Sequence, residues 1–258
     1  MINIHKKTLQ DLEFYTVLQQ VSEYSVTALG KNEVLNIAPY KTKEGLVTEL
    51  NCTNEYLSSF YNDNRIPNHG FEPITKELKL LKIENTYLEV FSLKKLVSIS
   101  LTTNEIITYL KKFEEYYPSL HTYASNIEVT KMIIEKIDDV VDRFGDIKNN
   151  ASALLNELRK SINAIKGKIN QSFTTALNAY QNLEYLDDIR ESVVDNKRVL
   201  AVKAMYRRKV KGAIMGGSKT GSIVYIEPET TLQFTRELNN LEYEAQEEII
   251  RILKELTN

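Results

Sequence analysis

Apolar residues recur at helical spacing through the first 148 residues of the chain. Leu9, Leu12 and Val17 open the first such series, and the longest series runs through residues 93–117. Glycines, prolines and short polar stretches separate the series, as is typical of helices joined by loops. The pattern predicts an all-helical region, a helical bundle, over residues 1–148.

A longer and more regular pattern follows. Apolar or small residues alternate steps of three and four over four heptads, which is the a/d seam of a coiled coil. The seam consists of Leu155, Leu158, Ile162, Ile165, Ile169, Ser172, Ala176, Ala179 and Leu183. It predicts one helix of about 34 residues, roughly 50 Å long at a rise of about 1.5 Å per residue.

The spacing of apolar residues changes to two from Lys197 onward. Three segments alternate or are rich in β-branched residues, namely residues 199–202, 206–214 and 222–226. They predict three short strands, with a glycine-rich turn between the last two. Helical spacing returns after Pro228 and continues to Asn258. We expect this second long helix to run antiparallel to the first, with the small sheet at the tip of the pair.

These patterns predict a mainly α protein, in which a helical bundle precedes a long antiparallel helical hairpin with a small antiparallel β-sheet at its tip. We expect two domains. The first is an all-helical core or connector over residues 1–148, and the second, residues 149–258, contains the paired helices and a β-rich segment at 196–228. The apolar stripe of the last helix still runs at Asn258, so we expect the chain to be a fragment of a larger protein.

The composition excludes several classes of protein. Apolar residues make up 42% of the 258 residues and charged residues 26%, with 9 Gly and 5 Pro, so the chain is neither disordered nor collagen-like. The single cysteine, Cys52, excludes an internal disulfide, and three scattered histidines form no metal cluster. No apolar run reaches the roughly 18 residues of a membrane span, and the N-terminus lacks the features of a signal peptide. We therefore expect a cytoplasmic protein without a membrane partner.

The basic residues are distributed unevenly. The formal net charge is −2, but between Asn196 and Ile226 the chain has eight basic residues and no acidic one. These residues are Lys197, Arg198, Lys203, Arg207, Arg208, Lys209, Lys211 and Lys219. The remaining chain has 25 basic and 35 acidic residues, a net charge of −10. The segment is therefore an isolated cationic feature in an acidic chain.

Two interpretations of this cationic segment remain open. Arginine binds phosphate oxygens through its planar fork and lysine as a point charge, so the eight side chains are candidate nucleic-acid contacts. Only Tyr206 and Tyr225 are aromatic there, which favours contact with a duplex or branched backbone over stacking on single strands. Alternatively, the cations pair with the glutamate-rich helix expected over residues 229–258, within one chain or between chains.

No motif in the sequence predicts an active site. Residues 216–222 contain the Lys-Thr pair of a phosphate-binding loop, and Gly212 and Gly217 have the glycine spacing of a Walker A motif. Ser218, however, occupies the position of the Walker A lysine, and a strand is expected to follow where that motif requires a helix. We therefore expect a turn at these residues. The histidines and the adjacent aspartate pairs also match no catalytic pattern.

The cationic segment resembles the clamp segment of the MutS family, in the branch often called the second MutS type. The matching residues are Val202, Lys203, Val210, Gly212, Ser218, Gly221 and the run Tyr225-Ile226-Glu227-Pro228. Residues 12–14, 26–31 and 238–241 are also similar to that branch. The chain departs from the family pattern at Ala201, Met215-Gly216 and Lys219-Thr220, where the family has Pro, His-Asp and small residues. These departures remove an acidic residue and add a cation, which is compatible with contact to a nucleic-acid backbone.

The resemblance implies an architecture and a function. Members of the branch are homodimeric ATPases of the mismatch-repair family that lack the mismatch-reading domain. They are linked to branched DNA, to suppression of recombination and, in some members, to stalled ribosomes. Residues 1–148 would then be the helical core or connector, the long helices levers, and the sheet a clamp that closes on nucleic acid. ATP and Mg²⁺ would belong to an ATPase domain, whose Walker motifs are absent from these 258 residues.

The sequence therefore favours one function and leaves another open. The first is a DNA-binding lever and clamp region of a MutS-like ATPase, with the eight basic residues as nucleic-acid contacts and without catalysis of its own. It would act in DNA repair and recombination control, as a homodimer in the full-length protein. The alternative is a helical adaptor that binds protein, RNA or ribosome partners through the hairpin.

Overall fold

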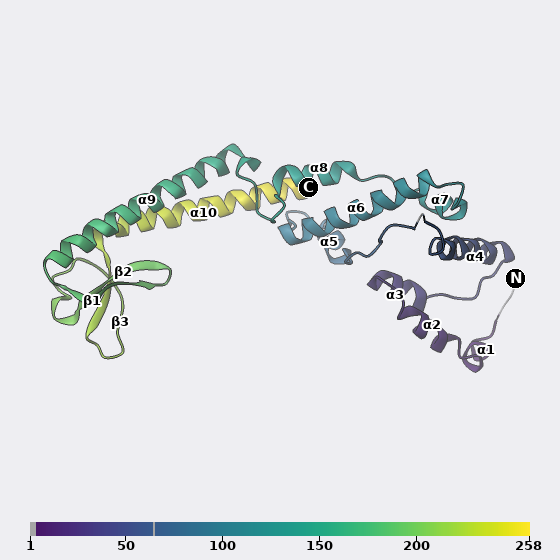
Figure 1. Cartoon of the computed structure of the whole chain (residues 1–258), viewed down its shortest axis with the longest axis horizontal. Coiled ribbons are helices and arrows are strands. Elements are labelled where there is room, and N and C mark those ends of the chain that lie inside the picture. The colour runs from purple at the N-terminus through teal and green to yellow at the C-terminus, as the bar shows by residue number, and fades with distance from the viewer. Residues whose placement is uncertain (1–3, 64) are drawn as a thin grey trace. The chain divides into compact units, whose positions relative to one another are not determined.

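The computed structural model describes residues 4–63 and 65–258. Most of them are helical, and a four-stranded antiparallel sheet lies in the C-terminal part (Figure 1). The expected class, mainly α with a small antiparallel sheet, is confirmed. The chain divides into two compact units: Met1–Lys148 with Leu253–Asn258 forms the first unit, and Asn149–Ile252 forms the second.

Helices are the main secondary structure of the first unit, which also has an isolated antiparallel bridge between Val141 and Ile147. Up to Lys148 its helices are α1 (Lys6–Asp11), α2 (Phe14–Ser22), α3 (Ala28–Leu35), α4 (Lys43–Ser58), α5 (Thr75–Leu80), α6 (Val90–Lys112), α7 (Pro118–Ala124) and α8 (Lys131–Val140). The carboxylate of Glu55 in α4 accepts hydrogen bonds from the N–H groups of Ser119 (2.9 Å) and Leu120 (2.9 Å) at the start of α7. This contact joins α4 to α7, because the N–H groups of a first helical turn have no partner within their own helix.

The helix expected through residues 93–117 corresponds to α6, which begins earlier, at Val90, and already ends at Lys112. The next helix, α7, begins at Pro118, where proline is favoured because the first helical residue needs no N–H donor. Tyr117 lies between them, is completely buried and forms a core cluster with Leu110 and Ala124.

The second unit combines two long helices with the sheet. Its elements are α9 (Ala153–Asn182), β1 (Leu186–Val194), β2 (Lys197–Lys203), β3 (Gly212–Gly217), β4 (Ile223–Pro228) and α10 (Glu229–Thr257), with short 3-10 turns at Asn149–Ala151 and Ala204–Tyr206. The final residues of α10 belong to the first unit.

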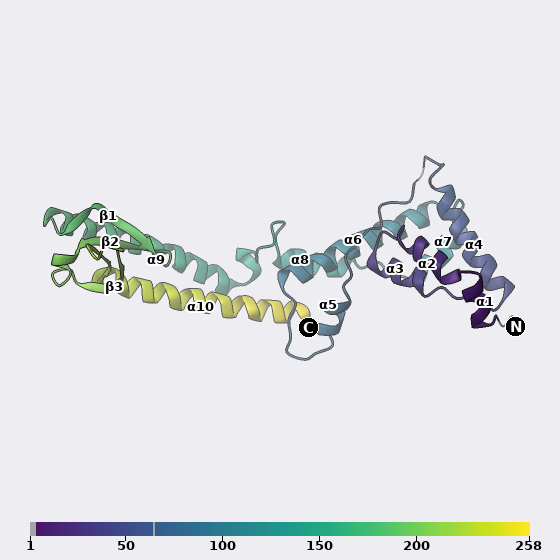
Figure 2. The same cartoon turned by 90° about the horizontal axis from the view of Figure 1, so that it is seen from below.

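Within the second unit, α9 and α10 lie side by side and run in opposite directions (Figure 1 and Figure 2). Polar pairs join them at three levels: Ser152 with Glu248 at 2.6 Å, Lys166 with Glu242 at 3.1 Å, and Ser172 with Thr231 at 3.5 Å. The residue numbers rise along α9 as they fall along α10, which is the order of an antiparallel pair.

The strand order of the sheet is β1-β2-β4-β3, and neighbouring strands are antiparallel. β2 and β3 are therefore not neighbours, since β4 lies between them. Lys203 at the end of β2 pairs with Ile223, whereas Gly212 at the start of β3 pairs with Pro228. The connection from β2 to β3 must therefore cross from one end of β4 to the other.

The expectation of three strands is wrong in two respects. β1 was not predicted, because its sequence is rich in charged residues and its pairing with β2 is irregular between Leu186 and Glu191, so no clean alternation is visible. The strand expected over 206–214 begins only at Gly212. Before it, Tyr206 and Val210 pack into the core four residues apart, within a segment that forms a turn and a loop instead of a strand.

The predicted seam of α9 is only partly correct. Leu155, Leu158 and Ile165 are buried, whereas Leu183 at the end of the seam is exposed and lies just beyond the helix. The helix has 30 residues rather than about 34. Its C-terminal half turns toward the sheet, where the completely buried Phe173 packs in the core cluster of the second unit. That cluster also contains Leu186, Leu200, Val202, Val210 and Ile226. Seam residue Ala176 beside Phe173 is buried as well, so the seam is lost only at its last two residues, Ala179 and Leu183.

Candidate nucleic-acid interface

The connection between β2 and β3, residues 204–211, is called the basic loop here. Its first N–H group, that of Ala204, donates to the carbonyl of Ser222 at 2.8 Å, next to the start of β4. Near its other end, Val210 is 5% exposed and belongs to the core cluster. The loop is therefore fixed at both ends, although it lies outside the strands.

Tyrosines attach the basic loop to α9. Tyr206 stacks on Tyr185, with ring centroids 4.7 Å apart, and Tyr185 stacks on Tyr180 at 6.4 Å. The N–H of Lys211 donates to the hydroxyl of Tyr180 at 3.3 Å. The carbonyl of Lys211 accepts from the N–H of Glu229, the first residue of α10, at 3.1 Å. The end of the loop is thus bound to both long helices of its unit.

Five of the eight predicted contact residues are exposed to solvent. They are Arg207, Arg208, Lys209 and Lys211 in the basic loop and Lys219 in the β3–β4 turn. Among residues 4–63 and 65–258, no carboxylate forms an ion pair with any of these five side chains. Their charges are available to an anionic partner, and guanidinium and ammonium groups suit phosphate oxygens.

Arg198, in contrast, is used within the fold. Its Nε and Nη2 atoms donate to Oε2 of Glu191 at 3.0 and 2.7 Å, across the β1–β2 pair. Its guanidinium also lies 4.3 Å from the ring centroid of Phe173 in α9, a cation–π contact. A side chain held by a carboxylate and an aromatic ring is a structural element of the sheet rather than a free contact.

Lys197 and Lys203 also have partners inside the protein. Nζ of Lys197 lies 3.4 Å from Oε2 of Glu227, and Nζ of Lys203 donates to the carbonyl of Glu184 at 3.4 Å. The sequence could not show this division of the eight cations. The segment between Asn196 and Ile226 has no acidic residue, but Glu191 and Glu227 flank it and fold back onto it.

Glu227 is a residue whose role the sequence did not indicate. It lies in the Tyr-Ile-Glu-Pro run at the end of β4 and is 2% exposed. Its carboxylate accepts a hydrogen bond from the hydroxyl of Thr235 in α10 at 2.6 Å, besides its contact with Lys197. These partners offset the cost of burying a charge. Glu227 thereby joins β4 to the start of β2 and to α10.

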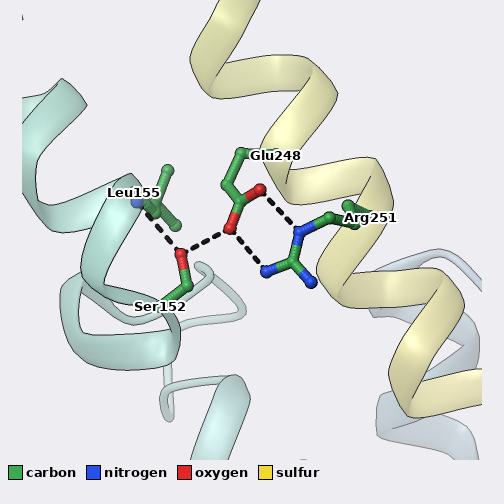
Figure 3. Close-up of polar contacts among 4 residues, drawn as sticks. All are labelled: Ser152, Leu155, Glu248 and Arg251. Carbon is green, nitrogen blue, oxygen red and sulfur yellow. Dashed lines mark hydrogen bonds and ion pairs between the residues drawn. The ribbon is translucent and has the colours of Figure 1, made fainter.

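A second buried carboxylate, that of Glu248, joins the start of α9 to the C-terminal part of α10 (Figure 3). Ser152 caps the start of α9 by accepting the N–H of Leu155 at 3.0 Å, and its hydroxyl donates to Glu248 at 2.6 Å. Nε and Nη2 of Arg251 donate to the same carboxylate, each at 2.7 Å. The Arg251 guanidinium and the Ser152 hydroxyl together lower the pKa of Glu248 from 4.5 to about 2.

The glycine-rich residues form the turn expected from the sequence. The N–H of Ser218 donates to the carbonyl of Ile223 at 3.0 Å, and Oγ of Ser218 accepts from the N–H of Ile223 at 3.1 Å. β4 follows the turn, in the place where a phosphate-binding loop requires a helix. The turn therefore lacks the helix N-terminus with which a Walker A motif holds phosphate.

The basic loop borders an open hollow of about 570 Å³. Arg207, Arg208 and Lys211 line it together with Leu232 and the carboxylate-bearing Glu229. Because one acidic residue shares the lining, the hollow has mixed charge. The candidate interface is therefore the set of exposed cations, of which Arg207, Arg208 and Lys211 also line this hollow.

Two features are absent from the described part of the chain: a cluster of potential metal ligands and a helix that could span a membrane. No group of three or more His, Cys, Asp or Glu side chains is arranged there to hold a metal ion. None of the helices that the structure describes combines the length and the apolar character of a membrane span.

Comparison with known proteins gives relatives along nearly the whole chain. Over 98% of its length it is 25% identical to Endonuclease MutS2 of Aquifex aeolicus, 26% identical to that of Alkaliphilus oremlandii and 27% identical to that of Staphylococcus saprophyticus. The chain spans about a third of the length of these curated relatives, 33%, 32% and 33% respectively. No protein-family model matches it. The resemblance to the second MutS type, drawn from the clamp segment, is confirmed.

Proposed function

We propose that this chain binds the phosphate backbone of DNA through its five exposed cations, Arg207, Arg208, Lys209, Lys211 and Lys219. The observation that carries the proposal is that these side chains have no carboxylate partner within the described residues and that four of them lie on one anchored loop. An ordered set of free cations attracts a polyanion, because phosphate contacts release condensed counterions.

The similarity to Endonuclease MutS2 supports a larger role for this interface. In this proposal the chain is part of a MutS-like ATPase that acts in DNA repair and recombination control. The sheet serves as a clamp on DNA, and α9 and α10 serve as levers that carry movement to it. ATP hydrolysis, Mg²⁺ binding and any nuclease activity belong to parts of such a protein outside these 258 residues.

Fluorescence anisotropy across a salt series tests the interface. With five phosphate contacts, log Kobs should fall with log salt at a slope of about −4.5, since each contact contributes about −0.9. A variant with Arg207→Ala, Arg208→Ala and Lys209→Ala should flatten the slope by about 2.7 and weaken binding to all sequences alike. Linear duplex, a four-way junction and structured RNA should be compared in parallel.

A matched control removes the same charge elsewhere. Lys76, Lys79 and Lys82 are exposed in and just after α5 of the first unit, and replacing all three by alanine should leave the slope unchanged. Equal losses in the two triple variants would show that net charge alone governs binding, and the proposed interface would then be wrong. Tightest binding to RNA would redirect the proposal to a ribosomal partner.

One observation favours the adaptor as a second candidate. The outward side of α10 exposes Tyr243, whose side chain is 67% accessible, beside the exposed Glu244 and Glu247. An aromatic residue flanked by carboxylates suits a basic protein surface. If no nucleic acid binds at low salt, this surface becomes the preferred site. The resemblance also implies a homodimer for the full-length protein. Measurement of the molecular mass of that protein in solution tests this expectation.

A further inference from the structure

The basic loop also presents an apolar side chain to solvent. Met205 is 78% exposed, more than any other large apolar residue described in Asn149–Ile252. An isolated exposed apolar residue is ordinary on a protein surface and needs no explanation. Met205 differs because it directly precedes Tyr206 and the three consecutive cations Arg207, Arg208 and Lys209.

The structure holds Met205 in a defined position. It is the central residue of the 3-10 turn Ala204–Tyr206. On one side the N–H of Ala204 donates to Ser222 at 2.8 Å, and on the other the ring of Tyr206 stacks on Tyr185 at 4.7 Å. Both neighbours of the methionine are therefore fixed, while its own side chain is exposed. The backbone that presents Met205 is therefore ordered before a partner binds, and only the rotamers of its side chain remain to be fixed.

Apolar side chains in basic surfaces have a specific use in nucleic-acid binding. Methionine, leucine, isoleucine, phenylalanine and proline enter between base pairs, unstack the step and kink the duplex. The cost is lowest where the bases are already unpaired or the step is flexible. Cations next to such a wedge hold the phosphates on either side of the opened step.

The geometry points to Met205 as a wedge that enters DNA at an interrupted base step while Arg207, Arg208 and Lys209 bind the neighbouring phosphates. This inference rests on the proposed function and names the substrate class for the same site. The preferred substrate is a duplex whose stacking is broken by an unpaired base, rather than a continuous duplex. The cations provide affinity for either duplex, and the methionine provides the preference for the interrupted duplex over the continuous one.

The test uses the full chain and two labelled duplexes, of which only one contains an unpaired base. In both duplexes, 2-aminopurine lies beside the position of that base. The wild-type chain should bind the interrupted duplex about tenfold more tightly, the effect of burying one methionine side chain. Its binding should also raise 2-aminopurine fluorescence, which reports unstacking. Met205→Ala should bind both duplexes equally and should cause no rise in 2-aminopurine fluorescence. Its salt slope should equal that of the wild type, because every cation remains. Met205→Leu should restore the preference.

Met132 provides the matched control, because it is 66% exposed in α8 of the first unit. Met132→Ala should behave as the wild type. If the wild-type chain binds neither duplex, the proposed function fails and the wedge with it. If it binds both with the expected slope but without preference, or if Met205→Ala keeps the preference, the wedge alone is overturned and the backbone contacts stand.

Discussion

Two buried carboxylates, Glu227 and Glu248, show how individual residues stabilise the second unit. Each is less than 5% exposed, and each interacts with at least two side chains, of which one is a cation. A buried carboxylate without such partners would be strongly destabilising. Both also join elements that are far apart in sequence, so their partners could not be read from local patterns.

Glu248 gives a prediction about pH. Its pKa of about 2 in the folded chain lies below the ordinary value of 4.5. A group whose pKa is lowered by folding stabilises the fold above its ordinary pKa, and this contribution disappears as the pH falls toward the folded value. We expect the free energy of unfolding of wild type and Glu248→Gln to differ above about pH 4.5 and to converge as the pH approaches 2.

Urea unfolding at a series of pH values measures this difference. Other carboxylates titrate in the same range, so the informative quantity is the wild-type value minus that of the variant. Glu244→Gln, on the exposed side of α10, is the matched control that removes one carboxylate from the same helix. A gap between wild type and Glu248→Gln that stays constant down to about pH 2 would contradict the role assigned to Ser152 and Arg251.

At the scale of elements, the β3–β4 pair depends on the absence of a side chain at Gly212. A Cβ atom there would lie 2.0 Å from the carbonyl oxygen of Glu227, a backbone atom of the neighbouring strand. No rotamer can relieve that contact, so the strands would have to separate. This pairing of β3 with β4 therefore requires glycine at position 212.

Two substitutions of the same kind should therefore have opposite effects. Gly212→Ala should destabilise the chain by about 1–3 kcal/mol or more, as forced overpacking does. Gly167 lies on the exposed side of α9, where an added Cβ atom would meet open space, so Gly167→Ala should stabilise the chain by about 0.5–1 kcal/mol through helix propensity. Thermal unfolding followed by circular dichroism checks both signs. Destabilisation of equal size in the two variants would refute the steric explanation.

At the scale of the whole molecule, each of the two units contains a core cluster of its own. Phe173 is completely buried in the core cluster of the second unit, and Tyr117 is completely buried in that of the first. The clusters share no residue. Loss of packing in one core should therefore be felt mainly within its own unit.

Hydrogen exchange resolved along the chain tests this independence. Phe173→Ala should cost about 3–5 kcal/mol, the range for large-to-small changes of a buried aromatic residue. Protection should fall in β1, β2 and β4 and persist in α6 and α7. Tyr117→Ala should produce the reverse pattern. A uniform loss of protection along the chain in either variant would show that the two units unfold as one.

Several properties of this protein were determined by the sequence alone. The helical spacing of apolar residues identified the long helices, and a spacing of two identified β2 and β4. Both patterns can be read from sequence because the repeat of a helix or strand is set by residues that are close together in the chain. The cationic segment and the resemblance to the second MutS type also needed only the order of residues, and the comparison with Endonuclease MutS2 confirmed that resemblance.

Other properties were decided only by tertiary structure. In sequence, the basic pair 197–198 looks like the basic pair 207–208. Strand pairing brings Glu227 to Lys197 and Glu191 to Arg198. It brings neither carboxylate to Arg207 or Arg208. The chain has to cross from one end of β4 to the other between β2 and β3, so residues 206–211, expected to form part of a strand, belong to the basic loop instead. Met205 is exposed on the same loop. The physical reason is that charge pairing and burial depend on which distant elements meet, and local periodicity carries no information about that.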